Sequence, residues 1–253
     1  MAHSQRFSLT HKTALVTGSS QGIGLAIARG LAEAGAHVIL NGRNAEKLAQ
    51  AEATFKQAGL SAESCCFDVT NPEEIKKALK SIGSKIDILV NNTGIQKRSL
   101  LVDMPLSDWK AVIDTNLTSA FIVSQVVAKG MIERKSGKIV NICSLMSELA
   151  RPTTGNYAAS KGGLKMLTKA MCGEWAKDNI QINGLAPGYI STELTQVLKN
   201  DPKFDAWIKG RTPANRWGEV EDLVGACVFL CSPAANFVNG QILTVDGGLS
   251  AVI

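Results

Sequence analysis

Short apolar runs alternate along this chain with longer segments in which apolar residues recur every three or four positions. The short runs are rich in β-branched residues, as buried strands are, and the longer segments are typical of helices that bury one face. Such alternation predicts an α/β fold with a doubly wound, mostly parallel seven-stranded sheet and helices on both faces. The expected strands cover 13–17, 37–40, 65–69, 86–90, 138–143, 180–185 and 242–245, and the expected helices include 22–34, 45–58, 72–82, 117–134 and 157–177.

Residues at the expected helix boundaries agree with this pattern. Asn44 and Asn71 precede helical segments and are expected to cap them, with Pro72 at a first helical position. Gly35 and Gly59 follow helical segments, where a residue with positive φ commonly ends a helix. The boundaries therefore support the helices that the periodicity predicts.

The chain reads as one domain over residues 1–253, because no repeat, linker or low-complexity tract divides it. Residues 188–217 break the alternation: they are polar, contain Pro202 and Pro213, and are longer than an ordinary α/β connection. We interpret this segment as a lid over the functional site.

Composition narrows the class of protein. The 253 residues are 45% hydrophobic, enough for one large core. The net charge of +5 is diffuse, with no long Lys/Arg block, so no nucleic-acid partner is expected. The first residues lack a signal-peptide apolar core and no apolar run approaches the roughly 20 residues of a bilayer span. A cytoplasmic protein without a membrane partner is expected.

Cysteine and histidine usage excludes several kinds of site. The six cysteines lack metal-ligand spacing except for the helix-spaced pair Cys227 and Cys231, which has no histidine beside it, and all six are expected to be free thiols. The three histidines, at positions 3, 11 and 37, lie near the start of the chain, far from the candidate site in the middle. Neither a metal site nor a Ser-His-Asp triad is expected, so hydrolysis is an improbable function.

A glycine-rich turn follows the first expected strand and opens the first helix. Glycines there allow a tight turn and close approach to a pyrophosphate, whose charge the helix N-terminus stabilises. In this position the motif predicts a Rossmann fold that binds a dinucleotide. The candidate cofactor residues of this turn are Gly18, Ser20, Gln21, Gly22, Ile23 and Gly24.

The end of the second strand bears on which dinucleotide binds. A Rossmann fold that prefers NAD usually has an acidic residue there, whereas this chain has Asn41 and Arg43. Arg43 is able to pair with a 2′-phosphate, and Asn41 to donate to it without repulsion. We therefore expect NADP as cofactor, with NAD as the alternative.

Tyr157 and Lys161 are four residues apart on an expected helix and share one of its faces. A neighbouring ammonium stabilises a phenolate, so the tyrosine becomes a usable proton donor and acceptor. Ser144 ends an apolar strand, at the edge where such sheets bind ligands, and is expected to donate a hydrogen bond to the substrate oxygen. The chemistry indicated is hydride transfer between an alcohol or ketone and a nicotinamide cofactor.

These motifs, in their order and spacing, resemble the short-chain dehydrogenase/reductase family over nearly the whole chain. Thr17-Gly18-x-x-x-Gly22-Ile23-Gly24, Asn91-Asn92-Thr93-Gly94, Tyr157-x-x-x-Lys161 and Pro187-Gly188 carry the resemblance. It implies that Asp68 and Val69 hold the adenine and that Asn92, Thr93 and Gly94 lie beside the cofactor. Ile190 and Thr192 would contact the nicotinamide carboxamide, and Lys161, with Tyr157, would hold the nicotinamide ribose. Asn116 would bind a water molecule that connects to Lys161.

Stretches on the substrate side are similar to the gluconate 5-dehydrogenase group of that family. They include residues 94–98, 141–149, 166–169, 186–189 and 211–218. The resemblance implies interconversion of D-gluconate and 5-dehydro-D-gluconate and a homo-oligomer, commonly a tetramer. Three alternatives remain: a 3-oxoacyl-carrier-protein reductase, another sugar or polyol dehydrogenase of the family, or a dinucleotide sensor without turnover.

A sugar-acid substrate needs a cation for its carboxylate, and a guanidinium is well suited to that role. Arg98 and Arg151 follow the two strand-end loops that flank the expected cleft. Tyr157 and Ser144 would meet the reacting carbon's oxygen, while Gln96, Ser147 and Glu148 are candidates for contacts with sugar hydroxyls.

Overall fold

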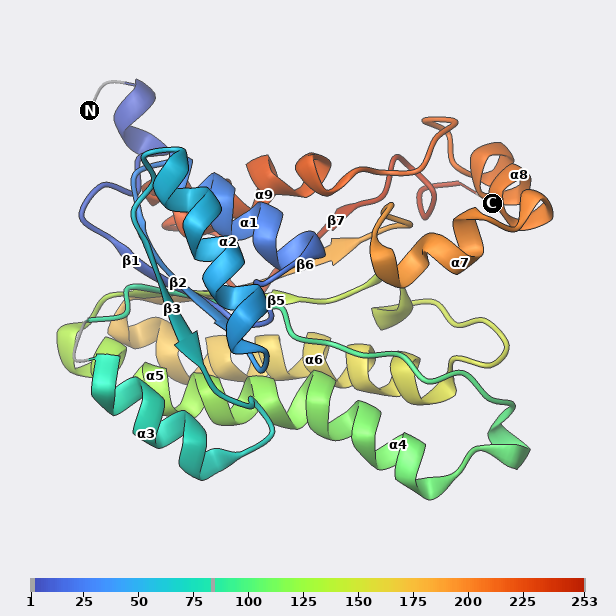
Figure 1. Ribbon diagram of the computed structural model, residues 1–253, viewed down its shortest axis with the longest axis horizontal. Coiled ribbons are helices and arrows are strands. Elements are labelled where there is room, and N and C mark those ends of the chain that lie inside the picture. Colours follow the sequence, from blue (N-terminus) through green and yellow to red (C-terminus); the bar gives the residue numbers. More distant parts are fainter. Residues whose placement is uncertain (1–2, 83–84, 253) are drawn as a thin grey trace.

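The computed structural model describes residues 3–82 and 85–252 and shows a three-layer α/β domain (Figure 1). The strands are β1 Thr13–Val16, β2 His37–Gly42, β3 Ala62–Cys66, β4 Ile88–Asn91, β5 Gly137–Ile142, β6 Ile180–Pro187 and β7 Ile242–Val245. The helices are α1 Gly22–Glu33, α2 Ala45–Gln57, α3 Pro72–Ile82, α4 Leu106–Ile113, α5 Ser119–Arg134, α6 Gly155–Trp175, α7 Gln196–Lys199, α8 Pro202–Arg211 and α9 Val224–Cys231.

The seven strands form one sheet in the order β3-β2-β1-β4-β5-β6-β7, and every pairing is parallel. The order reverses direction between β1 and β4, which creates a crevice at the carboxyl ends of those strands. The doubly wound seven-stranded sheet predicted from the sequence is confirmed. The predicted caps are also present, because Asn44 Oδ1 accepts from Lys47 N at 2.9 Å and Asn71 Oδ1 accepts from Glu73 N at 3.1 Å.

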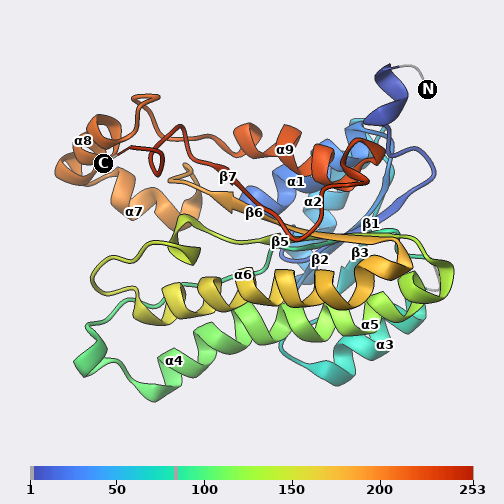
Figure 2. The same cartoon turned by 180° about the vertical axis from the view of Figure 1, so that it is seen from behind.

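The sheet separates two hydrophobic cores. Alternate residues of β1 face opposite sides, so Val16 packs with α1, α2 and α9 and Leu15 packs with α3, α5 and α6. Figures 1 and 2 show these two helix layers on either face of the sheet. Because both faces are covered, β1 and β4 are mostly apolar and buried, and β6 is buried along its whole length although it contains Gln181 and Asn183. The polar ends of these strands are left to form the site.

Two element boundaries differ from the sequence pattern. β3 occupies Ala62–Cys66, three residues before the expected strand, because Phe67 and Val69 bury their side chains in the core after the chain has left the sheet. The helix expected at 117–134 begins instead at Leu106 and runs through a π-helical turn, η3 Asp114–Thr118. A π-turn holds an extra residue, so the apolar positions before and after it are out of phase.

The continuous helix Leu106–Arg134 is long and apolar enough, by length and composition only, to span a membrane. Its most apolar 18-residue window has a mean hydropathy of 1.4, and 44% of that window is buried inside the domain. The inner face packs on the sheet through Val123, Val127 and Met131. This packing is that of a core helix in the layer on one face of the sheet. The outer face of the helix also carries apolar residues.

Candidate active site

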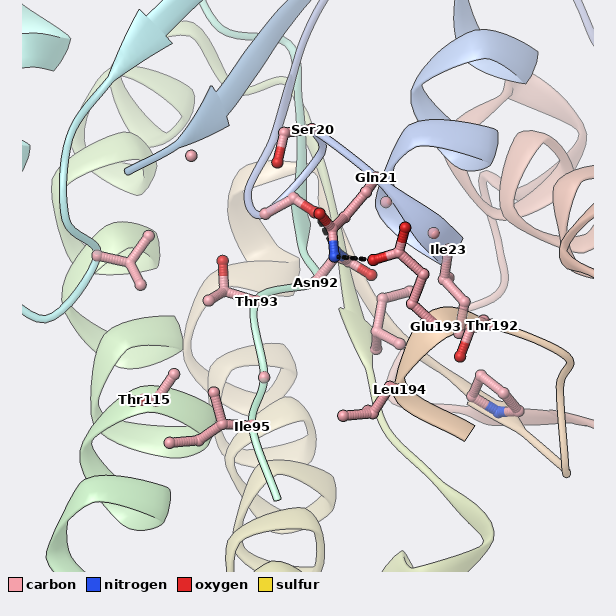
Figure 3. Close-up of a pocket in the computed structure, with 18 of the residues that line it drawn as sticks. Ser20, Gln21, Ile23, Asn92, Thr93, Ile95, Thr115, Thr192, Glu193 and Leu194 are labelled. Atoms are coloured by element: carbon pink, nitrogen blue, oxygen red, sulfur yellow. Dashed lines mark hydrogen bonds between the residues drawn. The ribbon is translucent and has the colours of Figure 1, made fainter. Parts of the chain in front are cut away.

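A cavity of about 420 Å³ lies along the carboxyl ends of the central strands. This volume is in the range of cofactor and small-molecule sites. Every residue predicted from the sequence to bind the cofactor lines it, together with Ser144. These residues are Gly18, Ser20, Gln21, Gly22, Ile23, Gly24, Asn41, Arg43, Asp68, Val69, Asn92, Thr93, Gly94, Tyr157, Lys161, Ile190 and Thr192. Figure 3 shows Gln21, in the turn after β1, beside Glu193 of the segment that follows β6.

The glycine-rich turn needs glycine for two separate reasons. Gly18 and Gly22 have φ angles of +61° and +58°, which strain a residue with a Cβ. Gly24 is packed so closely that an added Cβ would lie 2.3 Å from the Gly18 carbonyl oxygen. Asn92 closes the turn, because its Nδ2 donates to Thr17 O at 2.9 Å and to Gly18 O at 3.0 Å. The turn is thus shaped before any ligand arrives.

The side chain of Asn41 stabilises this turn through hydrogen bonds. It is 1% exposed, its Oδ1 accepts from Gly18 N at 3.3 Å, and its Nδ2 donates to Cys65 O and Phe67 O. Both of its amide hydrogens are therefore used by backbone carbonyls. Asn41 therefore has no free amide hydrogen for the hydrogen bond to a 2′-phosphate that the sequence suggested.

Arg43 remains accessible at the rim of the cavity. Its side chain is 74% exposed and its Nη1 lies 3.5 Å from Asp68 Oδ2. Burial raises the pKa of Asp68, but hydrogen bonds from Thr70 and the Arg43 charge outweigh it and hold the pKa below its usual range. The long, exposed contact between Arg43 and Asp68 is weak, so an incoming phosphate is able to replace it.

Thr93 supplies an independent indication that the cavity takes a polar ligand. Its Oγ1 is buried and has no hydrogen-bond partner among the residues described. The residue lines the cavity and packs against the glycine-rich turn, because a Cβ on Gly18 would lie 2.9 Å from Thr93 Oγ1 (Figure 3). An unpaired buried hydroxyl costs free energy unless a ligand satisfies it. This orphaned group and the preshaped turn both fit a dinucleotide.

Lys161 and Tyr157 meet at the floor of the cavity. Lys161 is 3% exposed, its Nζ donates to Ile142 O at 2.6 Å, and the same nitrogen lies 5.7 Å from the centre of the Tyr157 ring. The two residues are on one face of α6, as their spacing predicts. The structure therefore places an ammonium directly beside the phenol.

Asn116 lies behind the cavity rather than in its lining, on the π-helical turn η3. Its Oδ1 accepts from Ile95 N at 2.8 Å, and its Nδ2 donates to Ile95 O and to Ser160 Oγ. A Cβ on Gly94 would be 3.5 Å from Asn116 Oδ1 and 3.7 Å from Lys161 Nζ, so these groups are neighbours. Asn116 thus joins the loop after β4 to α6.

Ser144 is oriented by Ser147. The backbone N of Ser144 donates to Ser147 Oγ at 3.3 Å, and Ser147 Oγ donates to Lys161 O at 2.9 Å. Ser144 Oγ accepts from Met146 N at 3.2 Å, which leaves its hydroxyl hydrogen for a ligand in the cavity. Ser147 itself does not line the cavity, because its hydroxyl joins the serine loop to α6.

The remaining candidate substrate residues lie outside the cavity lining. Glu148 is exposed and forms an ion pair with Lys165. Arg98 donates from Nε and Nη2 to Gln96 Oε1 at 3.2 and 3.1 Å, and Arg151 Nη1 donates to Tyr189 Oη at 3.1 Å. Tyr189 was not among the candidates, although its position two residues after Pro187, at a strand end, is a usable signal.

Comparison with known proteins identifies the family. A family model described as Enoyl-(Acyl carrier protein) reductase matches residues 18–250. The gluconate 5-dehydrogenase of Gluconobacter oxydans is 52% identical over 99% of each chain, and the 5-keto-D-gluconate 5-reductase of Escherichia coli K12 is 49% identical over 98% of each. This chain belongs to the short-chain dehydrogenase/reductase family.

A solved structure agrees with that assignment. The gluconate 5-dehydrogenase of Burkholderia cenocepacia, determined in complex with NADP and tartrate, is 50% identical over 99% of each chain and superposes with a TM-score of 0.97. The single-domain α/β architecture and the oxidoreductase class predicted for this short-chain dehydrogenase/reductase are confirmed.

Proposed function

We propose that this protein is an NADP(H)-dependent oxidoreductase that interconverts a hydroxyl and a ketone on a sugar acid, D-gluconate and 5-dehydro-D-gluconate being the specific pair. The observation that carries the reaction type is that Tyr157, Lys161 and Ser144 line one cavity with the glycine-rich turn. Relatives that share about half of their residues with this chain are named for activity on gluconate or 5-keto-D-gluconate, which supports the substrate. The NADP and tartrate bound to one solved relative support the cofactor and a carboxylate substrate.

Tyr157 is the proposed proton donor and acceptor. In oxidation its phenolate takes the substrate hydroxyl proton, and in reduction the phenol returns it to the carbonyl oxygen. The Lys161 ammonium stabilises the phenolate across the 5.7 Å between Nζ and the ring. Ser144 Oγ–H donates to the substrate oxygen as its charge changes. When bound, the nicotinamide cofactor accepts or supplies the hydride.

The proposed cofactor contacts follow from the cavity. The backbone N–H groups at the start of α1 would bind a pyrophosphate, and Thr93 Oγ1 would supply a hydroxyl that has no partner among the described residues. Arg43 is the proposed ligand of a 2′-phosphate. Ile190 and Thr192 at the lid entrance are the proposed neighbours of the nicotinamide.

The lid, the assembly and the compartment are further parts of the proposal. Residues 188–217 form the lid: Glu193 at its base accepts from Gln21 Nε2 at 2.9 Å, which links it to the glycine-rich turn. Exposed apolar side chains on α5 and α6, Phe121 and Met166, support a homo-oligomer, with a tetramer as the specific proposal. The six free cysteines support a reducing compartment such as the cytoplasm.

A spectrophotometric screen tests the substrate. We expect NADP reduction with D-gluconate and NADPH oxidation with 5-dehydro-D-gluconate, at much higher kcat/KM than with neutral polyols. The panel includes 2-dehydro-3-deoxy-D-gluconate and a 3-oxoacyl thioester. Turnover of the thioester without turnover of any sugar acid would replace the proposal with a carrier-protein reductase, and cofactor binding without turnover of the whole panel would indicate a sensor.

A further inference from the structure

Arg98 and Arg151 form a pair of cations without an acidic partner. Their loops follow β4 and the 3-10 helix Leu145–Ser147, and a backbone hydrogen bond of 3.2 Å from Ser99 N to Thr153 O joins them. Within residues 3–82 and 85–252, neither guanidinium forms an ion pair with a carboxylate. Burial lowers the pKa of Arg98 and the charge of Arg151 lowers it further. Two guanidiniums without a carboxylate partner, on loops that are bonded to each other, favour an anion bound to both.

Tyr189, from the start of the lid, holds Arg151 in this pair. Its Oη accepts from Arg151 Nη1 at 3.1 Å. The Arg151 guanidinium also lies over the ring of Phe204, 4.8 Å from its centre. Arg151 is therefore held at two points by the lid, one polar and one aromatic.

An aromatic cluster in the lid holds Tyr189 in turn. Its ring meets Phe204, Trp207 and Trp217 edge-on, with centroid distances of 5.7, 6.4 and 5.8 Å. Trp217 is 3% exposed and donates from Nε1 to Asp205 Oδ1 at 2.8 Å, which attaches the cluster to α8. Figures 1 and 2 show α7 and α8 at the same end of the domain. This packing leaves Tyr189 little rotational freedom.

We propose that Tyr189 is a positioning residue that sets the preference for a carboxylate, an inference that rests on the proposed function. Tyr189 and Phe204 hold the Arg151 guanidinium beside that of Arg98, and the two guanidiniums bind the carboxylate of the sugar acid. Because one cation is held by the lid and the other by the loop after β4, the carboxylate bridges lid and domain. A neutral sugar derivative lacks this bridge.

The substitution Tyr189→Phe tests the inference, because it removes the acceptor oxygen and keeps the ring. With D-gluconate we expect KM to rise about tenfold, the effect of losing a hydrogen bond to a charged group, and kcat to change less than twofold. With D-gluconamide, which has the same hydroxyls without the charge, KM stays within twofold of wild type. Equal increases for both substrates would overturn the inference.

A double-mutant cycle separates positioning from a direct or purely structural role. If Tyr189 acts through Arg151, Tyr189→Phe has no further effect on KM in an Arg151→Met background. Phe204→Leu, which keeps apolar packing but removes the aromatic face, raises KM for D-gluconate about threefold and leaves D-gluconamide unchanged. A full tenfold effect of Tyr189→Phe in the Arg151→Met protein would exclude positioning.

The outcomes for wild type distinguish this inference from the proposed function. If the enzyme oxidises no sugar acid, the proposed function fails and the inference falls with it. If it oxidises D-gluconate and D-gluconamide with equal kcat/KM, sugar oxidation stands and the carboxylate site is excluded. The exposed Arg29→Ala variant on α1, remote from the lid, is the matched arginine control and should match wild type with both substrates.

Discussion

Among the features of individual residues, the burial of Lys161 says most about function. A lysine that is 3% exposed, with no carboxylate paired to it among the described residues, is costly to keep charged in a folded protein. Its Nζ hydrogen bond to Ile142 O offsets part of that cost and fixes the ammonium beside Tyr157. The arrangement favours a stabilised phenolate over a purely structural role.

Replacement of Tyr157 tests this chemistry. We expect Tyr157→Phe to lower kcat about 10³-fold, because positioned proton transfer contributes roughly 10²–10⁴-fold. The dissociation constant for NADP and the melting temperature should stay near their wild-type values, since the ring is retained. Pre-steady-state and steady-state kinetics with D-gluconate measure the change, and a kcat within tenfold of wild type would contradict the assignment.

Replacement of Arg43 tests the cofactor preference. We expect Arg43→Ala to raise KM for NADP about tenfold or more, because a charge-assisted contact to the 2′-phosphate is lost. KM for NAD should change less than twofold. Steady-state kinetics with both cofactors measure this, with Arg29→Ala as the exposed arginine control. Wild-type preference for NAD, or equal effects on both cofactors, would refute the role of Arg43.

At the scale of elements, the loops after β4 and β5 and the lid depend on side chains that join them to neighbouring elements. Asn116 joins the β4 loop to α6, and Ser147 joins the serine loop to α6. Arg216, in the segment after β6, bonds Asp222 in the 3-10 helix Val220–Leu223 that precedes α9. Each of these side chains forms a hydrogen bond to a backbone group or a charged side chain on another element. The site geometry is therefore set by contacts between elements rather than within them.

The contact between Arg216 and Asp222, in the 3-10 helix before α9, predicts a pH dependence of stability. Arg216 donates to both carboxylate oxygens of Asp222 and, with the Glu219 backbone N–H, lowers the pKa of Asp222 to about 2. Because the folded pKa lies below the ordinary value of 3.8, the stabilisation is present above about pH 4 and is lost as the pH falls toward 2.

Urea unfolding of Asp222→Asn between pH 7 and pH 3 measures this contribution. We expect the variant to be about 1 kcal/mol less stable than wild type at pH 7, the upper range for exposed pairs, with the difference shrinking below pH 4. Glu221→Gln, an exposed neighbour that forms no ion pair among the described residues, is the control. If the difference in unfolding free energy between variant and wild type did not depend on pH, the ion pair would not be its cause.

At the scale of the whole molecule, the helical layer formed by α4, α5 and α6 remains incompletely covered. The helix Leu106–Arg134 contains an 18-residue window with a mean hydropathy of 1.4, and only 44% of that window is buried. Phe121 on α5 and Met166 on α6 are 44% and 59% exposed. Apolar surface of this kind on the outer side of a helix layer favours self-association.

Light scattering coupled to size-exclusion chromatography tests this surface. We expect wild type to elute as a tetramer and Phe121→Asp to elute as a smaller species, because a charge at a buried apolar contact is strongly unfavourable. Far-UV circular dichroism should show the same helix content in both. A monomeric wild type, or a Phe121→Asp protein of unchanged mass, would place the interface elsewhere or exclude it.

The sequence by itself determined the alternation of strands and helices, the glycine-rich turn, and the shared face of Tyr157 and Lys161. These features are local: a side-chain period, a turn that requires positive φ, and a four-residue helical spacing are all properties of neighbouring residues. For the same reason Asn44, Asn71 and the paired helix residues lie where their positions predict.

Only the tertiary structure decided which side chains remain for ligands. Asn41, Ser147 and Glu148 look available in the sequence, but backbone groups and Lys165 occupy them once distant segments pack together. Conversely, Tyr189 acquires a partner, Arg151, that is 38 residues away along the chain. Hydrogen-bond partners brought together by folding carry no local signal, so they become visible only when the strand order and the lid are known.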